Sequence, residues 1–415
     1  MFVRETLPGG LRLVTENIPH LKSVSIGIIV GLGSQNESYE KRGLSHFLEH
    51  MTFKGTKKRR AKDIVAALDG IGGKINAYTS KEFTKYYIVV SDEHVGFAIE
   101  LLGDIFLNSL FKKQDIETER NVILEEIKMY EDTPDELVHD LFSQVVWNKH
   151  RLGYGILGEK STVEKINRSD FINYQDRYYN CKNTIIACAG KLSHDSISKK
   201  VQNVFKGLKE STFDEEKYLN PKTKHAEKIF YKDTEQSHVC LGGRGYSYGD
   251  PRRYSLSVLN MILGGAMSSR LFQNIREKEG LVYAIYSYHT FFKNTGLFTI
   301  YAGTSPKTYK RVVNLIVSEI NKICEKGITK EELRIAKEKL KGNLVLGLET
   351  SQSRMSWIAK SEYYYNKIIK VEEIINKINK VTSSDVIDTA KDILNINNMS
   401  LVTLGPVKKK IFSWN

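Results

Sequence analysis

Residues 42–56 read RGLSHFLEHMTFKGT, a short amphipathic segment with two histidines one helical turn apart. Successive helical residues are about 100° apart, so His46, Glu49 and His50 share one face. The apolar residues at positions 44, 47, 48 and 51 fall on the opposite face, which predicts a helix over residues 44–51 resting on a core. Two imidazoles at this spacing suit zinc, and the neighbouring carboxylate can take a proton from zinc-bound water. The order H-x-x-E-H is the inverse of the better-known H-E-x-x-H.

A solvated helix face that carries two histidines by chance is the alternative, because a catalytic zinc also needs a third protein ligand and an open position. A helix predicted over residues 113–130 carries Glu117, Glu119, Glu125 and Glu126. Glu119 and Glu126 are seven residues apart and share a face. The residues themselves do not decide between Glu125 and Glu126 as the ligand. The apolar contacts of this helix are expected from Val122, Ile123 and Ile127.

Around these two helices the first half of the chain alternates strands and helices. Period-two and continuous apolar runs predict strands, and 3.6-residue periods predict helices. The expected strands are 11–16, 23–31, 74–80, 86–91 and 184–189, and the further helices are 61–68, 93–107 and 195–205.

The second half repeats this plan. A strand at 239–244 matches 24–33, a helix at 254–263 stands where 44–51 stood, and a hairpin at 280–290 and 296–302 mirrors 74–91. Helices at 307–326 and 330–348 and a strand at 400–404 follow. The repeat predicts a duplicated chain of the α+β class: two homologous α/β halves, each with an antiparallel-rich mixed sheet packed with helices.

The polar stretch 209–224 contains Pro221 and no sustained period, which is typical of a linker. The predicted organisation is therefore an N-terminal zinc-binding catalytic domain over residues 1–210, a linker over 211–225, and a C-terminal domain of the same fold over 226–415. The C-terminal domain is expected to contact the substrate.

Composition narrows the class of protein. The chain has 415 residues, with 62 Lys and Arg against 49 Asp and Glu, a formal charge of +13. The basic residues are scattered and not interleaved with aromatic residues, so we expect no nucleic-acid partner. Four cysteines without a C-x-x-C pair predict reduced thiols. No run approaches about 18 apolar residues and no signal-peptide pattern opens the chain, so we expect a cytoplasmic protein without a membrane partner.

The stretch 42–56 resembles the signature of the pitrilysin/insulinase family of zinc metallopeptidases, in the branch of the mitochondrial processing peptidase β-subunit and its bacterial homologues. Glu126 follows His50 by 76 positions, where the family has its third ligand. The resemblance therefore implies Glu126 rather than Glu125, one Zn²⁺ per chain, and Glu119 as a supporting carboxylate that orients a ligand. It also implies that the two halves form half of a clamshell chamber.

Two further stretches carry the resemblance. Residues 73–79 (GKINAYT) resemble an edge strand to which the substrate adds as a further strand, although without the family they form an ordinary hairpin strand. The substrate-binding residues implied are Asn76, Ala77, Tyr78 and Thr79. Residues 264–272 and 276–283 also match, apart from Ala266 in place of a third glycine. Arg276 would bind substrate carbonyls and Tyr283 would stabilise the oxyanion, both at the zinc site of a partner subunit.

The predicted function is a zinc metalloendopeptidase that cleaves peptides or unfolded, presequence-like segments, with Glu49 as the general base. The acidic stretch 117–136 suggests basic peptides as substrates. The main alternative is a non-catalytic structural or partner subunit of the same fold, although such relatives typically lose the H-x-x-E-H residues that this chain keeps. The assembly is expected to be a homodimer or a heterodimer with an inactive relative. Manganese or cobalt could replace zinc in vitro.

Overall fold

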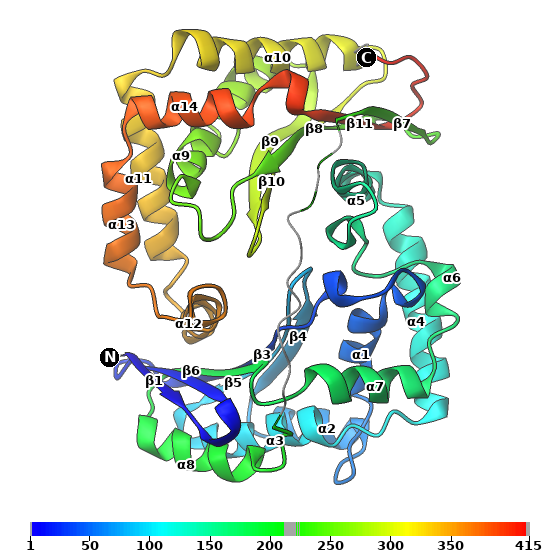
Figure 1. The fold of residues 1–415 in the computed structure, drawn as a ribbon, viewed down its shortest axis with the longest axis vertical. Coiled ribbons are helices and arrows are strands. Elements are labelled where there is room, and N and C mark those ends of the chain that lie inside the picture. The colour runs from blue at the N-terminus through cyan, green and yellow to red at the C-terminus, as the bar shows by residue number, and fades with distance from the viewer. Residues whose placement is uncertain (1, 211–220, 222, 224, 412–415) are drawn as a thin grey trace. The chain divides into compact units, whose positions relative to one another are not determined.

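The computed structural model describes residues 2–210, 221, 223 and 225–411. The described chain forms two compact units, and neither unit is a continuous piece of sequence (Figure 1). Unit 1 contains residues 2–128, 154–210 and 347–369, and unit 2 contains residues 129–153, 221, 223, 225–346 and 370–411.

Unit 1 is built on a six-stranded mixed sheet. Its strands are β1 (Phe2–Thr6), β2 (Arg12–Asn17), β3 (Ser23–Val30), β4 (Lys74–Thr79), β5 (Thr84–Ser91) and β6 (Thr184–Gly190). The spatial order is β1-β2-β6-β3-β5-β4, and only the β2–β6 pair is parallel. Strand β4 therefore lies at an edge, with β5 as its neighbour.

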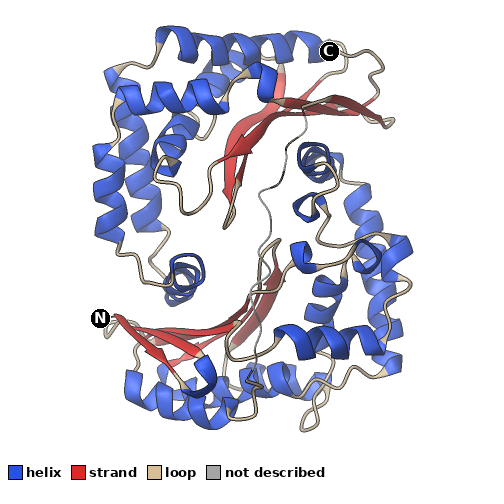
Figure 2. Ribbon diagram, viewed as in Figure 1, coloured by secondary structure: helices blue, strands red, loops and turns tan. Residues whose placement is uncertain are grey.

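Both faces of this sheet are apolar and both are covered by helices (Figure 2). Side chains alternate along a strand, so Ile26 and Ile28 join one core while Ile29 joins another. Helix α12 (Ser351–Tyr365) covers the second face so closely that a Cβ on Gly27 would lie 2.5 Å from Sδ of Met355. The helices of unit 1 are α1 (Leu44–Thr52), α2 (Ala61–Asp69), α3 (Val95–Leu107), α4 (Lys113–Glu131), α6 (Lys160–Val163), α7 (Arg168–Tyr178), α8 (His194–Phe205) and α12 (Ser351–Tyr365).

Unit 2 repeats the sheet of unit 1. Its strands are β7 (Glu227–Tyr231), β8 (Ser237–Gly245), β9 (Val282–Phe291), β10 (Gly296–Thr304) and β11 (Ser400–Gly405), in the order β7-β11-β8-β10-β9. The β7–β11 pair is parallel and the others are antiparallel, as in the matching series β2-β6-β3-β5-β4. The same order and the same strand directions confirm the predicted duplication and the α+β class.

One face of the second sheet is covered by a helix from the first half of the sequence. Val138, Phe142 and Trp147 of α5 (Pro134–Trp147) share a core with Cys240 and Val402 of the sheet. The other helices of unit 2 are α9 (Arg253–Leu263), α10 (Tyr309–Lys326), α11 (Lys330–Leu346), α13 (Val371–Lys380) and α14 (Ser383–Ile393), with a π-helix at Phe272–Lys278. Helix α5, from the first half of the chain, therefore packs on the sheet of unit 2, and α12, from the second half, packs on the sheet of unit 1.

The predicted elements agree with the structure to within two residues at each end, but strands β1 and β7, helices α5 to α7 and α12 to α14, and the π-helix were not predicted. The contiguous division into 1–210 and 226–415 differs from the compact units, because α5 and α12 are exchanged between them. Residues 211–220, 222 and 224 of the predicted linker lie outside the described residues. The four cysteines are free thiols, as expected. Among the described residues, no helix combines the length and apolar character needed to cross a membrane.

Candidate metal centre

Helix α1 presents a polar face and an apolar face, as its sequence predicts. Leu44, Phe47, Leu48 and Met51 are at most 2% exposed and belong to the main core of unit 1. The opposite face carries His46, Glu49 and His50, because these positions lie about one turn apart. The rings of His46 and His50 are close, with centroids 4.6 Å apart. Core packing on one side therefore fixes the direction of the polar side chains on the other.

Glu126 of α4 completes a three-residue cluster with the two histidines. Its Oε2 lies 3.8 Å from Nε2 of His46 and 3.8 Å from Nε2 of His50, which is longer than a hydrogen bond. One ligand atom from each of the three residues lies within 4.8 Å of the others. Ligand atoms about 2.0–2.2 Å from a tetrahedral zinc lie roughly 3.3–3.6 Å apart. The donor set and its spacing fit such an ion after small side-chain shifts.

His46 is held in the neutral form that a metal ligand needs. Burial, with a smaller contribution from repulsion by His50, lowers the pKa of His46 to about 3. Among the described residues its buried Nδ1 has no hydrogen-bond partner. The imidazole is therefore neutral near pH 7, and a single ring proton placed on Nδ1 would leave Nε2, which lies 3.8 Å from Oε2 of Glu126, available to a cation.

The buried side of α4 selects Glu126 rather than Glu125 for this position. Ile123 and Ile127 are buried in the core, and Glu126 lies on the flank that meets α1. Glu125 instead points away and pairs with Lys128 at 2.6 Å. The prediction that Val122 anchors this helix is wrong, because its side chain is 47% exposed. Val122 directly precedes the buried Ile123, and successive side chains on a helix point about 100° apart, so Val122 faces away from the core.

Glu119 lies two turns before Glu126, behind His50. Its Oε2 is 3.1 Å from Nδ1 of His50, and its Oε1 pairs with Lys54. A carboxylate on Nδ1 fixes the ring orientation and leaves Nε2 to face the cluster. The sequence reasoning had placed Glu119 on this face but missed Lys54, although Lys54 stands in the same 42–56 stretch.

Glu49 is partly buried beside the cluster and is held by strand β4. The hydroxyl of Thr79 donates to Oε2 of Glu49 at 2.5 Å. Burial raises the pKa of Glu49, while the Thr79 hydrogen bond and the neighbouring His50 oppose that rise. Thr79 was predicted to bind the substrate, and the structure places its hydroxyl on Glu49. The sequence carried no signal for this contact, since the two residues are thirty positions apart and on different elements.

The rest of the predicted substrate strand lies on β4. Asn76 pairs with Tyr87 and Ala77 with Tyr86 of β5, so the other edge of β4 has no strand beside it in the described sheet. The ring of Tyr78 lies 4.8 Å from the ammonium of Lys85. An edge strand next to Glu49 can add an extended peptide through main-chain hydrogen bonds.

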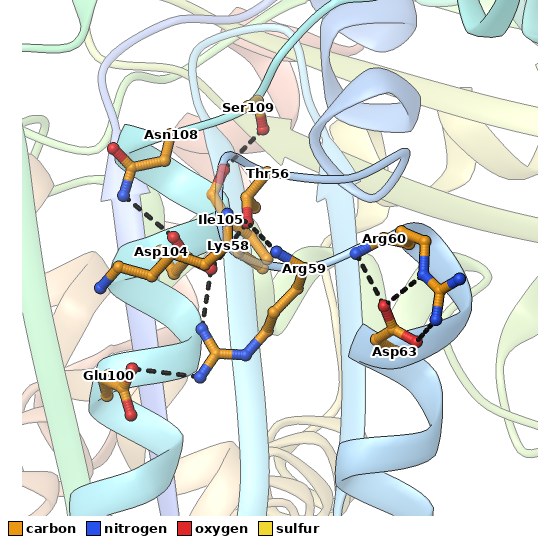
Figure 3. A network of polar contacts seen from close by, with 10 residues as sticks. All are labelled: Thr56, Lys58, Arg59, Arg60, Asp63, Glu100, Asp104, Ile105, Asn108 and Ser109. Atoms are coloured by element: carbon orange, nitrogen blue, oxygen red, sulfur yellow. Dashed lines mark hydrogen bonds and ion pairs between the residues drawn. The ribbon is translucent and has the colours of Figure 1, made fainter.

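A polar network holds the segment that follows α1 (Figure 3). Asp104 of α3 is buried and accepts hydrogen bonds from Thr56 Oγ1 and Arg59 Nη1, each at 2.8 Å. Asn108 donates to the other oxygen of Asp104 at 2.9 Å, and Ser109 donates to the carbonyl of Thr52 at 3.2 Å. These contacts tie the C-terminal end of the helix that carries the histidines to α3.

Arg276 and Tyr283 belong to unit 2. Arg276 lies in the π-helix, with its guanidinium 4.7 Å from the Phe272 ring, and lines a cavity of about 690 Å³ with Gly264 and Gly265. Tyr283 is the second residue of β9 and is 79% exposed. It lines a separate cavity of about 430 Å³. Their role at the metal centre stays a prediction.

Relatives of this chain carry names that agree with the chemistry of the cluster. A protein of Bacillus subtilis named "Uncharacterized zinc protease YmxG" is 42% identical, over 98% of each chain. A protein of Streptomyces coelicolor, also named an uncharacterized zinc protease, is 38% identical over 98% of this chain and 90% of its own.

Two solved structures share the fold. A Pseudomonas fluorescens protein described as a peptidase M16 inactive domain superposes with a TM-score of 0.92 at 19% identity, over 99% of each chain. A protease from Helicobacter pylori gives a TM-score of 0.89 at 23% identity, over 98% of this chain and 99% of its own.

Two family patterns match consecutive parts of the sequence. The pattern described as Insulinase (Peptidase family M16) matches residues 12–160, and the pattern described as Peptidase M16 inactive domain matches residues 165–340. The first match includes all the residues of the cluster. With both patterns in this order and full-length relatives at 42% and 38% identity, the chain belongs to the pitrilysin/insulinase family of peptidases, family M16.

Proposed function

We propose that this chain is a zinc-dependent endopeptidase that holds one Zn²⁺ at His46, His50 and Glu126. The observation that carries the proposal is the convergence of these three ligand atoms beside the partly buried carboxylate of Glu49. Two imidazoles and one carboxylate leave a fourth position open, as in catalytic rather than structural zinc sites. Glu119 behind His50 supplies the orienting contact that such ligands usually have.

The residues around the ion would divide the chemistry between them. When bound, the metal would polarise the scissile carbonyl and make a nearby water molecule more acidic. Glu49 takes a proton from the attacking water and returns it to the leaving amine. The hydrogen bond from Thr79 holds one oxygen of Glu49 in place, and burial brings the pKa of Glu49 closer to the working range of a general base.

The substrate would lie along β4 as an additional strand, bonded through the main chain of Asn76 to Thr79. Arg276 would bind carbonyl oxygens of the peptide, and Tyr283 would donate a hydrogen bond to the oxyanion as it develops. The high exposure of Tyr283 and the cavity beside Arg276 support these roles. We propose that Arg276 and Tyr283 act on the site of a partner subunit, in a homodimer or in a heterodimer with an inactive relative.

Basic peptides, such as presequence-like segments, are the substrate class that we propose. Asp135, within the acidic stretch 117–136, lines the cavity of Tyr283 together with Glu235. Among the described residues no Lys or Arg forms an ion pair with either carboxylate, so both could pair with a basic side chain of the substrate. The rings of Tyr283 and Tyr286 line the same cavity. Equal kcat/KM values for a Lys-containing peptide and its Gln-substituted counterpart would rule out this preference.

The decisive experiment compares the parent protein with Glu49→Gln on a fluorogenic, unstructured basic peptide, with zinc content measured for both. Glu125→Gln is the matched control, because Glu125 is an exposed glutamate directly beside Glu126 in sequence. We expect one zinc per chain in all three proteins, cleavage by the parent and the control, and a loss of several orders of magnitude in kcat for Glu49→Gln.

Each other outcome has a defined meaning. A parent protein that purifies without metal and cannot be reconstituted contradicts the proposal. If all three proteins hold zinc and none cleaves, each protein is assayed again after mixing with a relative from the same cell as partner subunit. Continued inactivity then supports the alternative, a non-catalytic subunit of the same fold.

A further inference from the structure

The helix that carries the histidines begins at a residue without a capping side chain. Gly43 precedes α1 with φ = +91°, a left-handed conformation that favours glycine. A Cβ at this position would also lie 2.5 Å from the carbonyl oxygen of Leu157. An N-cap side chain usually accepts hydrogen bonds from the first free N–H groups of a helix. Gly43 cannot do so, and those donors need another acceptor.

Glu37 supplies the acceptor from six residues upstream. Its Oε2 accepts the N–H of Gly43 at 2.8 Å, and its Oε1 accepts the N–H of Ser45 at 2.7 Å. The side chain is fully buried. The positive charge of Lys81 also favours the ionised form of Glu37, but less than the hydrogen bonds from Ser45 and Gly43 do. The main partners of this buried carboxylate are therefore the N–H groups at the positive end of α1.

We propose that Glu37 is a positioning residue for the metal centre, which fixes the first turn of α1 and with it His46. This inference rests on the proposed zinc site. Ser45, whose N–H is bonded to Glu37, directly precedes His46 in the chain. The first turn of a helix frays when its N–H groups lose their acceptors. His46 lies in that turn, whereas His50 lies one turn later and is also held by Glu119.

A general effect on stability must be separated from this local effect. The matched control is Asp104→Asn, which weakens another buried carboxylate that ties the opposite end of the α1 segment to the core. Glu40→Gln is a second control, because Glu40 lies in the same loop as Glu37 and is exposed. Burial raises the pKa of Glu37 to about 7, against the donation from Ser45 and Gly43. Measurements at pH 8 therefore keep the carboxylate largely ionised.

The experiment measures the zinc Kd by chelator competition, and the free energy of unfolding of the metal-free protein, for each variant. We expect Glu37→Gln to bind zinc about 10-fold or more weakly, since its amide can accept only one of the two N–H groups. Asp104→Asn should be less stable yet bind zinc within about twofold of the parent, and Glu40→Gln should change neither quantity. If Glu37→Gln does not fold, Glu37→Asp keeps the charge with a shorter reach and should bind zinc several-fold more weakly.

Two results would overturn different claims. A folded Glu37→Gln or Glu37→Asp with the zinc Kd of the parent, or an equal loss of zinc affinity in Asp104→Asn, would show that Glu37 has no specific effect on the metal centre. A parent protein that does not bind zinc would instead contradict the proposed function. The parent measurement therefore separates failure of the inference from failure of the function on which it rests.

Discussion

Replacing Thr79 by Val tests whether Glu49 acts as the general base. The substitution removes the hydroxyl that donates to Glu49 at 2.5 Å and keeps the β-branched shape that suits strand β4. A hydrogen bond to a charged group contributes about 1.5–3 kcal/mol. One pKa unit corresponds to about 1.4 kcal/mol, so the pKa of Glu49 should rise by about 1–2 units. Thr84 keeps its own hydrogen bond to the carbonyl of Leu32, at 2.8 Å.

The sign follows from the role of Glu49. A general base must be ionised to take a proton, and burial already raises the pKa of this carboxyl. Removing the Thr79 donor raises the pKa further, so the acid limb of kcat/KM should move to higher pH by about 1–2 units. The assay is the pH profile of peptide cleavage between pH 5.5 and 9 with zinc held saturating. Thr79→Ser keeps the hydroxyl and should keep the profile of the parent.

The reasoning is refuted if Thr79→Val, folded and loaded with zinc, gives a profile that superposes on those of the parent and Thr79→Ser. Superposed profiles would mean either that the ionisation of Glu49 does not control the acid limb or that the Thr79 hydroxyl does not stabilise its charged form. A fall in kcat/KM by the same factor at every pH would likewise contradict a pKa effect and would point to a misplaced strand.

Three further predictions concern the same unit. Glu119→Gln should weaken zinc binding about 10–100-fold by calorimetric titration, because a neutral amide orients His50 less strongly, while Glu125→Gln should bind like the parent; equal Kd values would contradict this role. Burial, with repulsion by a neighbouring lysine, lowers the pKa of Lys85 to about 8, so its charged form is disfavoured in the folded state. The unfolding free energy of the parent should therefore rise relative to Lys85→Met between pH 8 and 10.5, by at most about 3 kcal/mol, and a pH-independent difference in urea denaturation would contradict it. Met355→Ala should lower the unfolding free energy by about 2–5 kcal/mol, because Met355 is fully buried between α12 and the sheet; a loss below about 1 kcal/mol in urea would show that the exchanged helix is not needed there.

The sequence predicted the sheets well because their strands are regular apolar runs that recur in both halves. It did not predict α5 and α12, although both have buried faces. Helix α12 has serine, tyrosine and charged residues on most of its surface, so its apolar stripe is narrow and its period is weak. The apolar run of residues 28–30 at the end of β3 does indicate a sheet buried on both faces. Periodicity cannot say which distant helix covers the second face.

The candidate site was predictable only in part. The H-x-x-E-H spacing identified His46, Glu49 and His50, because one helix places them together by local geometry alone. The choice of Glu126 over Glu125 required the family resemblance, since both are polar positions on one helix. The contacts of Thr79 and Lys54 with the site carboxylates join elements that meet only in the fold. Local pattern specifies residues on one element, whereas the pairing of elements depends on how their cores pack.

Four glutamates around α1 differ in their neighbours, and the neighbours account for the role assigned to each. Glu37 accepts two main-chain N–H groups, so its lone pairs are committed to the helix end. Glu119 contacts His50 through Oε2 and Lys54 through Oε1, and Oε2 of Glu49 accepts the hydrogen bond from Thr79. Among the described residues none donates a hydrogen bond to Glu126, and the Nε2 atoms of the two imidazoles lie 3.8 Å from its Oε2, beyond hydrogen-bond distance. Of the four, Glu126 directs its Oε2 at a point shared with the Nε2 atoms of His46 and His50, and a divalent cation at that point would bind all three atoms.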